Sequence, residues 1–370
     1  MEFSCAKTDL LGATQIVSRG IPSTTAEPML LNVFATLADG CLTLLATDNR
    51  ITIQNRFQVQ QARPGRMAVS GHLLLEVLQA IQTSRSDSVT LDCQSGWKVS
   101  LVSADARYSL SGFDPDDFPI VPAFEGQTQF SLPGDLLKEM IRKVVVVTSG
   151  SMGGMQTYEE VLFEAKDGEL TLVATDSVRL AIRSESLEGR SLPELNFLIP
   201  SHALIEASRI LKGDEEINWD VSEDQAAIRS GTTELRARLS DKTFPNFRMI
   251  LPKSQSRNLR VNTREFRDSL KGVIPLAREI KDKVYIEFES DRLIISSTSI
   301  ELGEARREME VSLEGEPIKL AFNGKYLLDF LSVIDTETFR WGMTSATYPA
   351  TLTPDSDGST YTYILMPITH

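Results

Sequence analysis

The stretch Met67–Leu78 reads MAVSGHLLLEVL, and its pattern returns at Phe197–Ser208 (FLIPSHALIEAS) and at Leu320–Leu331 (LAFNGKYLLDFL). In each stretch an apolar run leads through a small or polar residue into a segment of helical period. Each stretch also carries an acidic residue at the same place, and these residues are Glu76, Glu206 and Asp329. The repetition predicts a strand that runs through a capping residue into a helix, three times in one chain.

The spacing of the repeats matches that of small domains. The three acids lie 130 and then 123 positions apart, which is too long for a solenoid unit. A second pattern, Asp39–Asp48, returns at Asp167–Asp176, and its strand portion returns at Asp291–Thr298. We therefore predict three copies of one domain, at residues 1–122, 123–252 and 253–370.

Each copy is predicted to be an α+β domain that combines a sheet with two helices. Short runs such as Ile51–Gln54 and Val89–Asp92 alternate apolar and polar residues, as half-buried antiparallel strands do. Two longer stretches of the first copy, Thr8–Ser18 and Gly71–Thr83, are long enough to form helices that cover one face of the sheet. We expect edge strands of neighbouring copies to pair, so that one sheet continues into the next.

Proline-containing connectors follow the first and second copies, at residues 114–122 and 241–252. Proline lacks a backbone donor and biases the preceding residue toward extended geometry. We therefore expect each connector to be stiff and strand-like, and to fix the orientation of the copies that it joins.

The composition is that of an ordinary globular protein of 370 residues, with 41% hydrophobic residues and a formal net charge of −13. No apolar stretch is long enough to span a membrane and no signal peptide stands at the start, which predicts a cytoplasmic location. The cysteines Cys5, Cys41 and Cys93 lack the paired spacing of a zinc site. We expect them to be buried free thiols.

Motifs for catalysis are missing from the sequence. His72 and His202 occupy equivalent positions at the starts of two predicted helices, which favours a scaffold feature over catalysis, and the third histidine is His370. The stretch Gly150–Gly154 lacks the lysine and the serine or threonine of a phosphate-binding loop. We therefore expect a protein that is not an enzyme and that binds no cofactor and no metal.

Three other stretches carry a resemblance to a known family. Ala174–Ala181 reads ATDSVRLA, the second connector contains Phe244–Pro252 (FPNFRMILP), and Tyr363–Pro367 (YILMP) lies near the end of the chain. Together they resemble the β subunit of bacterial DNA polymerase III, the sliding clamp, and the resemblance covers the whole chain. It implies a head-to-tail homodimer with six similar domains in a ring, an outer wall of sheet, and helices that line the pore around duplex DNA.

The resemblance also implies what the protein binds. One partner is double-stranded DNA, held without sequence preference. The others are the polymerase III catalytic subunit, the clamp loader, repair polymerases and mismatch-repair proteins, which insert short peptide motifs into an apolar pocket. Carried over onto this sequence, the pocket residues are Tyr158, Thr175, Ser177, Val178, Arg179, Leu180, Pro245, Met249, Ile250, Tyr326, Pro349, Ile364, Met366, Pro367 and Ile368.

The predicted pocket departs from the family pattern at three positions. Ser177 and Val178 stand where Gly-His is common, and Met249 replaces a frequent arginine. We expect these changes to alter the preference for partner peptides and to leave the pocket in place. Asp176 is not assigned to the pocket, because Thr47–Asp48 repeats the motif in a copy that has no pocket, and this favours a role in closing a turn.

An acidic chain is unusual for a protein that binds DNA, because lysine and arginine supply most of the nonspecific affinity for phosphate. A ring resolves this conflict, since enclosure retains DNA without tight contact. The predicted helices are more basic than the chain as a whole, although pairs such as Glu139 and Lys143 equally fit helical charge pairing. The DNA-facing candidates are Lys138, Arg142, Lys143, His202, Arg264, Arg267 and Lys271.

Two alternatives to a clamp stay open from the sequence. The first is a non-catalytic scaffold ring, or a divergent clamp paralogue that recruits partners without supporting replication. Neutralising the basic residues of the helices would then change nothing. The second and more distant alternative is a metal-dependent hydrolase, which a bound metal or a loss of turnover in His72→Ala would support.

Overall fold

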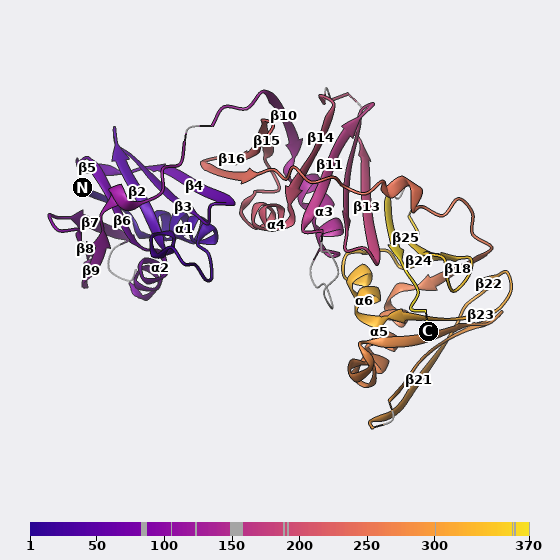
Figure 1. The fold of residues 1–370 in the computed structure, drawn as a ribbon. Coiled ribbons are helices and arrows are strands. Elements are labelled where there is room, and N and C mark those ends of the chain that lie inside the picture. Colours follow the sequence, from indigo (N-terminus) through magenta and orange to yellow (C-terminus); the bar gives the residue numbers. More distant parts are fainter. Residues whose placement is uncertain are drawn as a thin grey trace. The chain divides into compact units, whose positions relative to one another are not determined.

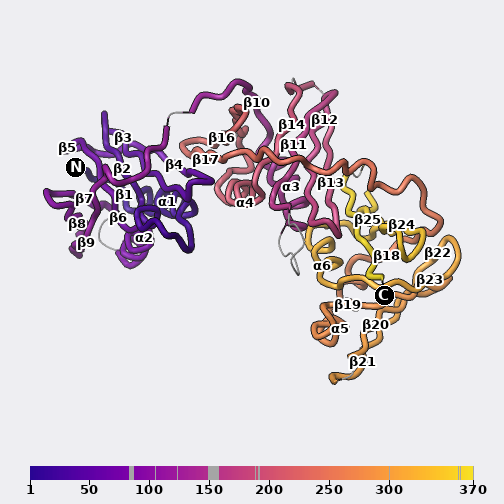
Figure 2. Tube along the Cα trace, viewed as in Figure 1, coloured from indigo at the N-terminus to yellow at the C-terminus, as the bar shows by residue number. Residues whose placement is uncertain are grey.

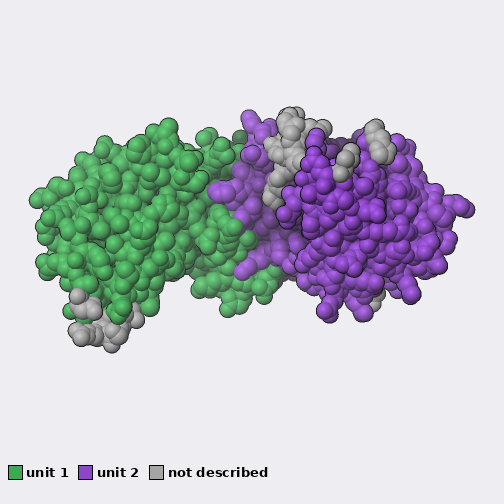
Figure 3. Space-filling model, turned by 90° about the horizontal axis from the view of Figure 1, so that it is seen from below, with its two compact units in different colours: residues 1–136, 206–239 green, residues 137–205, 240–370 purple. Residues whose placement is uncertain are grey.

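The computed structural model describes residues 1–82, 87–104, 106–122, 124–148, 158–187, 189–190, 192–299, 301–356, 358 and 360–369. They belong to two compact units, and Figure 3 gives each its own colour. Unit 1 comprises residues 1–136 and 206–239, and unit 2 comprises residues 137–205 and 240–370. The domain boundaries at 122 and 252 stay a prediction.

Six α-helices are found among the described residues, and each begins directly after a strand (Figure 1). They are α1 (Lys7–Val17), α2 (Gly71–Ala80), α3 (Gly134–Val145), α4 (Ser201–Ile210), α5 (Thr263–Ala277) and α6 (Gly324–Ser332). The hydroxyl of Ser70 accepts the N–H of Leu73 at 3.4 Å, and the side-chain oxygen of Asn323 accepts the N–H of Lys325 at 2.9 Å. The strand, cap and helix pattern of the sequence is confirmed.

Unit 1 contains one antiparallel sheet, which can be followed along the Cα trace in Figure 2. Its strand order is β10-β15-β16-β17-β4-β3-β2-β6-β9-β8-β7-β1-β5. In chain order the strands are β1 (Glu2–Ala6), β2 (Asn32–Ala38), β3 (Cys41–Thr47), β4 (Ile51–Gln58), β5 (Gln60–Arg63), β6 (Gly65–Ser70), β7 (Ser88–Cys93), β8 (Lys98–Val102), β9 (Arg107–Phe113), β10 (Thr128–Pro133), β15 (Glu216–Val221), β16 (Gln225–Ser230) and β17 (Thr233–Arg238).

Unit 2 contains two antiparallel sheets, with strand orders β14-β11-β12-β13-β26-β25-β24-β18-β22 and β21-β20-β19-β23. The strands are β11 (Glu160–Lys166), β12 (Glu169–Thr175), β13 (Arg179–Ser186), β14 (Leu195–Pro200), β18 (Arg257–Asn262), β19 (Lys283–Phe288), β20 (Arg292–Ser299), β21 (Gly303–Glu310), β22 (Leu313–Glu314), β23 (Ile318–Asn323), β24 (Thr338–Met343), β25 (Ala350–Pro354) and β26 (Tyr361–Leu365).

Strands from consecutive predicted copies pair with each other in both units. In unit 1, β17 runs antiparallel to β4, with Thr233 opposite Asn55. In unit 2, β13 runs antiparallel to β26, with Arg179 opposite Leu365. The expected continuation of one copy's sheet into the next is therefore present at both places.

Helix α5 packs against strands of both sheets of unit 2 through a cluster of aromatic rings around Trp341 of β24. The indole is fully buried, and the rings of Phe266 on α5, Phe288 on β19 and Phe322 on β23 lie 5.4, 5.1 and 5.5 Å from it between centroids. Such rings bury large apolar areas and pack edge to face. They bind one helix and three strands of unit 2 into a single core.

The prediction that both connectors are strand-like is wrong. Each contains a single 3₁₀ turn, η3 (Pro115–Asp117) in the first and η4 (Phe247–Met249) in the second. Pro115 stands at the first position of its turn, where the fixed φ of proline suits a helical start. Aromatic burial favours the bends as well, because Phe118 stacks on Phe34 at 5.1 Å and Phe247 is only 5% exposed.

The end of helix α5 is set by its backbone conformation. The helix ends at Ala277, and the 3₁₀ turn η5 (Arg278–Ile280) follows. Lys281 and Asp282 then both adopt positive φ angles of 57°, and this left-handed backbone cannot continue a right-handed helix.

The three cysteines are free thiols, as predicted, but only Cys93 is fully buried, while Cys5 and Cys41 are half-buried. Burial raises the pKa of the Cys5 thiol to about 12, so this thiol stays protonated near neutral pH.

No described helix is long and apolar enough to cross a membrane. Among the described residues no group of three or more His, Cys, Asp or Glu side chains is placed to hold a metal ion. Gly150–Gly154 and His370 lie outside the described residues.

Candidate functional site

The turn between β12 and β13 builds one wall of the candidate site. One carboxylate oxygen of Asp176 accepts the backbone N–H groups of Val178 and Arg179 at 3.1 and 3.0 Å. In the first copy Asp48 accepts the N–H groups of Arg50 and Ile51 at 2.8 and 2.7 Å in the same way. Asp176 therefore closes a turn, as the repetition of the Thr-Asp motif predicted.

Ser177, inside this turn, has a φ of 78°. This is the left-handed region, which costs free energy for any residue with a Cβ. The Thr175 hydroxyl helps to hold the strained backbone, since it accepts the Ser177 N–H at 3.2 Å and donates to the Arg179 carbonyl at 2.7 Å. The position thus requires a conformation that glycine adopts freely and that Ser177 adopts at a cost.

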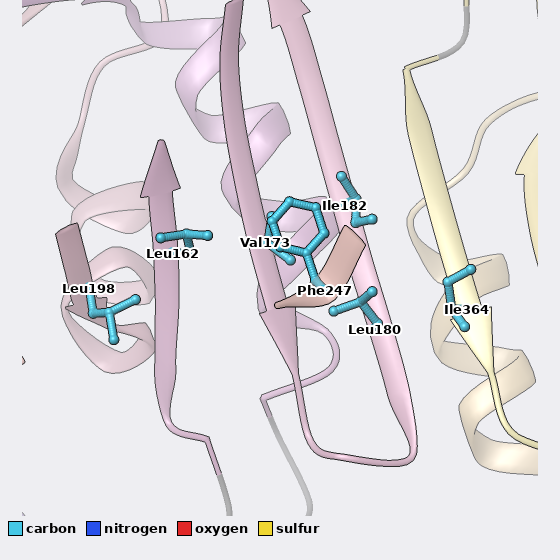
Figure 4. Close-up of a cluster of buried hydrophobic side chains, with 7 residues drawn as sticks. All are labelled: Leu162, Val173, Leu180, Ile182, Leu198, Phe247 and Ile364. Carbon is cyan, nitrogen blue, oxygen red and sulfur yellow. The ribbon is translucent and has the colours of Figure 1, made fainter. Parts of the chain in front are cut away.

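A buried apolar cluster lies behind the turn (Figure 4). Phe247 of η4 packs over the strands that carry Val173, Leu180 and Ile182, and Ile364 joins them from β26. The bend of the second connector is what brings the phenyl ring onto the sheet. The cluster consists of Leu162, Val173, Leu180, Ile182, Leu198, Phe247 and Ile364.

A mostly apolar cavity of about 240 Å³ opens beside this cluster. Ile250 and Met366 form exposed parts of its rim, with 40% and 37% exposure. The Met366 N–H donates to the Val178 carbonyl at 2.9 Å, which attaches the end of β26 to the turn. The lining consists of Tyr158, Thr175, Ser177, Val178, Arg179, Leu180, Pro245, Ile250, Ile364 and Met366, and every one of these residues belongs to the predicted pocket.

Five predicted pocket residues do not line this cavity. Met249 is 82% exposed after Phe247, Tyr326 lies on α6, and Pro349 is half-buried before β25. Pro367 is buried, and the Ile368 N–H donates to the Ala321 carbonyl at 2.7 Å. Their part in peptide binding stays a prediction.

A second and larger cavity, of about 540 Å³, adjoins the first and shares Pro245 with it. It lies under the second connector and is lined by Ser240–Arg248 with Leu162, Glu164 and Asn196–Leu198. Sequence reasoning missed this cavity, because it arises from the bend of a connector that was expected to be extended. The aromatic pair Phe244 and Phe247, three residues apart, was the available signal for a packed bend.

Arg179 is the most unusual member of the cavity wall, because its side chain is completely buried. Its Nε donates to Asp176 at 2.8 Å, and a terminal nitrogen donates to Asp329 of α6 and to the Tyr363 hydroxyl. Burial by itself lowers the pKa of a guanidinium, but Tyr363 and the hydrogen bonds to Asp329 and Asp176 raise the pKa of Arg179 above its ordinary value. The cation is therefore retained in the protein interior.

The seven DNA-facing candidates lie on three helices, α3, α4 and α5. Lys143 pairs with Glu139, as the i,i+4 spacing predicted, and Arg142 pairs with Asp335 at 3.0 Å. Arg267 donates to the Leu331 carbonyl. Arg264, His202 and Lys271 are exposed, and the Arg264 side chain reaches 92% exposure. Contact of any of them with DNA stays a prediction.

The repeated α+β copies, joined by shared sheets and carrying an apolar cavity, define a repeat-built protein of the clamp fold. Family models of the DNA polymerase III beta subunit match the chain in order: the N-terminal domain at residues 1–122, the central domain at 131–246 and the C-terminal domain at 248–369. The chain belongs to the DNA polymerase III beta subunit family, and the resemblance seen in the sequence is confirmed. Proteins of this family are non-catalytic, and this chain is not an enzyme.

Relatives match over nearly the whole length of the chain. The "Beta sliding clamp" of Halalkalibacterium halodurans is 28% identical over 362 residues, which cover 94% of each chain. That of Bacillus subtilis is 26% identical and covers 100% of this chain and 99% of its own length. The crystal structure of the Bacillus subtilis DNA polymerase sliding clamp superposes with a TM-score of 0.92 over 100% and 99% of the two chains, at 26% identity. The Thermotoga maritima beta subunit, at 24% identity and a TM-score of 0.91 over 100% and 99%, shares the fold.

Proposed function

We propose that this protein is a sliding clamp. Two copies close head to tail around duplex DNA without reading its sequence, and they hold the replicative polymerase on its template. The clamp loader, repair polymerases and mismatch-repair proteins use the same peptide cavity. This function places the protein in the cytoplasm, where bacterial DNA is copied, and it assigns one clamp domain to each of the spans 1–122, 123–252 and 253–370.

The observation that carries this proposal is the way in which consecutive copies join. The last strand of the second copy, β17, pairs with β4 of the first copy, and the last strand of the third copy, β26, pairs with β13 of the second copy. Strands β4 and β13 occupy equivalent positions in their copies. By the same rule β9 of the first copy and β21 of the third should be joining strands. Within the described residues β21 pairs only with β20, and β9 reaches β6 through only two residue pairs.

The free edges of β21 in one protein molecule and of β9 in a second molecule are suited to pair with each other. Most residues of β21 are exposed, including Glu304, Arg306 and Arg307. An exposed edge strand is a template for pairing with another chain. Pairing of β21 with β9 of a second copy repeats the internal junctions, and a head-to-tail contact used twice closes into a ring.

Closure also explains how a chain with a net charge of −13 serves on DNA. Tight binding of duplex DNA needs many lysine and arginine contacts to phosphate, and its strength falls steeply with salt. A ring retains DNA by topology. A few exposed lysine and arginine side chains on α3 and α5 therefore suffice, and the ring stays free to move along the duplex. An acidic remainder repels DNA from the other surfaces.

We expect the quadruple variant Lys138→Ala, Arg142→Ala, Arg267→Ala and Lys271→Ala to stay on circular DNA for a shorter time than the wild type. Each lost phosphate contact should make the negative slope of log affinity against log salt shallower by about 0.9. The measurement is retention on nicked circular DNA across a salt series.

The matched control removes four positive charges from strands: Lys166→Ala, Arg238→Ala, Arg292→Ala and Lys319→Ala. It should retain DNA as the wild type does. Equal behaviour of the quadruple helix variant and the wild type would favour the scaffold ring instead.

A further inference from the structure

We propose that Asp329 is a positioning residue for the peptide cavity and acts through Arg179. Asp329 lies on α6 and is not part of the cavity lining, so the peptide need not touch it. The inference rests on the proposed peptide-binding role of the cavity. It adds that the cavity keeps its shape only while α6 holds the start of β13 in place.

Arg179 occupies a position from which it controls the cavity wall. It is the first residue of β13, and its two neighbours, Val178 and Leu180, both line the cavity. Its own side chain is fully buried, so its guanidinium does not serve as a surface that the peptide meets. What Arg179 supplies is therefore the placement of the residues on either side of it.

Among the described residues, a turn, a helix and a strand each hold the guanidinium. The turn contributes Asp176, at 2.8 Å from Nε, and α6 contributes Asp329. Strand β26 contributes the Tyr363 hydroxyl, which accepts from Arg179 at 3.3 Å and donates to the Tyr326 carbonyl at 2.9 Å. The guanidinium carbon also lies 3.9 Å from the centroid of the Tyr326 ring, within the range of a cation–π interaction.

Loss of the Asp329 carboxylate removes the ionic link between Arg179 and α6. A buried cation that loses a charged partner rearranges toward whatever partners remain, because an unpaired charge in the interior is costly. The backbone of Val178 and Leu180 moves with it, and Tyr326 loses the cation beneath its ring. Peptide affinity should fall although no cavity residue has changed.

The internal repetition supports a junction role for this acid. Glu206 occupies the same place in α4, the sixth residue of the helix, and it also pairs with an arginine of the preceding copy, Arg19, at 3.2 Å. The residues that line the peptide cavity include neither partner of that pair. The acid is thus a repeated joining device, and in the third copy it has gained an influence on binding through the placement of Arg179.

The middle of β13 offers a matched control. Arg183 lies four residues further along the strand, and its side chain is 10% exposed. It pairs with Glu139 of α3 at 3.0 Å and bonds to Thr360. Glu139→Gln therefore removes an ion pair from the same strand, together with the pair to Lys143, at a place that lines no part of the peptide cavity.

The experiment measures binding of the fluorescein-labelled peptide Ser-Leu-Ser-Leu-Phe to the full-length protein by fluorescence anisotropy, with thermal melting of each variant. We expect Asp329→Asn to raise Kd about tenfold, and Glu139→Gln to leave Kd within about twofold of the wild type. Asp329→Glu keeps the charge and should recover most of the affinity. A merely structural role would lower the melting temperature of Asp329→Asn and Glu139→Gln without separating their Kd values.

The outcomes separate the two proposals. If Asp329→Asn binds as the wild type does while Met366→Ala loses affinity, the positioning role is wrong and the cavity keeps its function. If Glu139→Gln loses as much affinity as Asp329→Asn, the effect is general loosening of the unit and the positioning role is again wrong. If the wild type does not bind the peptide at all, the proposed function of the cavity fails.

Discussion

Met366→Ala is expected to weaken binding of a peptide with leucine and phenylalanine anchors by about 30-fold or more, because truncation of a residue that carries much of the binding energy typically costs about 2 kcal/mol or more. Met366 is 37% exposed at the rim of the cavity, and its backbone N–H is bonded to Val178. Its thioether is therefore available to a ligand while its main chain is fixed. A flexible, polarisable side chain of this kind adapts to different partner peptides.

Anisotropy titration with a labelled peptide measures this loss. Leu302→Ala is the control, because it shortens an equally apolar side chain that is 53% exposed and does not line the cavity. Leu180→Ala should lose affinity as well, but Leu180 is only 2% exposed and belongs to the buried cluster, so thermal melting must accompany it. Unchanged affinity in both Met366→Ala and Leu180→Ala would place the peptide site elsewhere.

Proline in β21 is expected to convert the dimer into a monomer. Neighbouring residues of a strand direct their backbone N–H groups to opposite sides, so one of Arg306 and Arg307 faces β20 and the other faces the free edge. Proline removes the N–H and leaves the facing carbonyl of the other copy without its donor, which costs about 1–3 kcal/mol, or about 5- to 150-fold in the dissociation constant of the dimer. The outward-facing variant should keep its melting temperature and lose dimerisation, and the inward-facing variant should lose stability.

Sedimentation velocity measures the result, since the wild-type dimer should have twice the 41.0 kDa mass of the chain. Ala62→Pro provides the control. Ala62 lies on the exposed edge strand β5 and falls in a gap of its pairing register with β1, so proline there should leave the dimer intact. A folded wild-type-like dimer in both β21 variants would show that the copies join through some other surface.

The sequence predicts the architecture well, because the repeated pattern is a local property. Ser70 and Asn323 cap their helices through bonds to residues two or three positions further on, so capping does not depend on distant parts of the chain. The apolar residues that follow must be buried on one face of the helix. Pairing between copies follows from the same repetition. The shape of the connectors could not be predicted in this way, since it depends on the distant surfaces that bury Phe118 and Phe247.

In the candidate site, too, local features could be predicted from the sequence and features set by packing could not. The predicted residues that line the cavity come mostly from one turn and its adjoining strands, where neighbours in sequence are neighbours in space. Met249, Tyr326 and Pro349 come from a bend, a helix and a loop, whose distance from the cavity is set by packing. The complete burial of Arg179 was equally out of reach, because an arginine in a sequence is normally read as an exposed residue.

Retention on circular DNA before and after a single cut distinguishes enclosure from adhesion. The protein is loaded by its clamp loader onto a nicked circular plasmid, freed of unbound protein by gel filtration, and then treated with a restriction enzyme that cuts once. We predict that it stays on the circle and leaves the linear product, because a ring held by topology slides off free ends. Equal retention on the circular and the linear DNA would contradict the clamp.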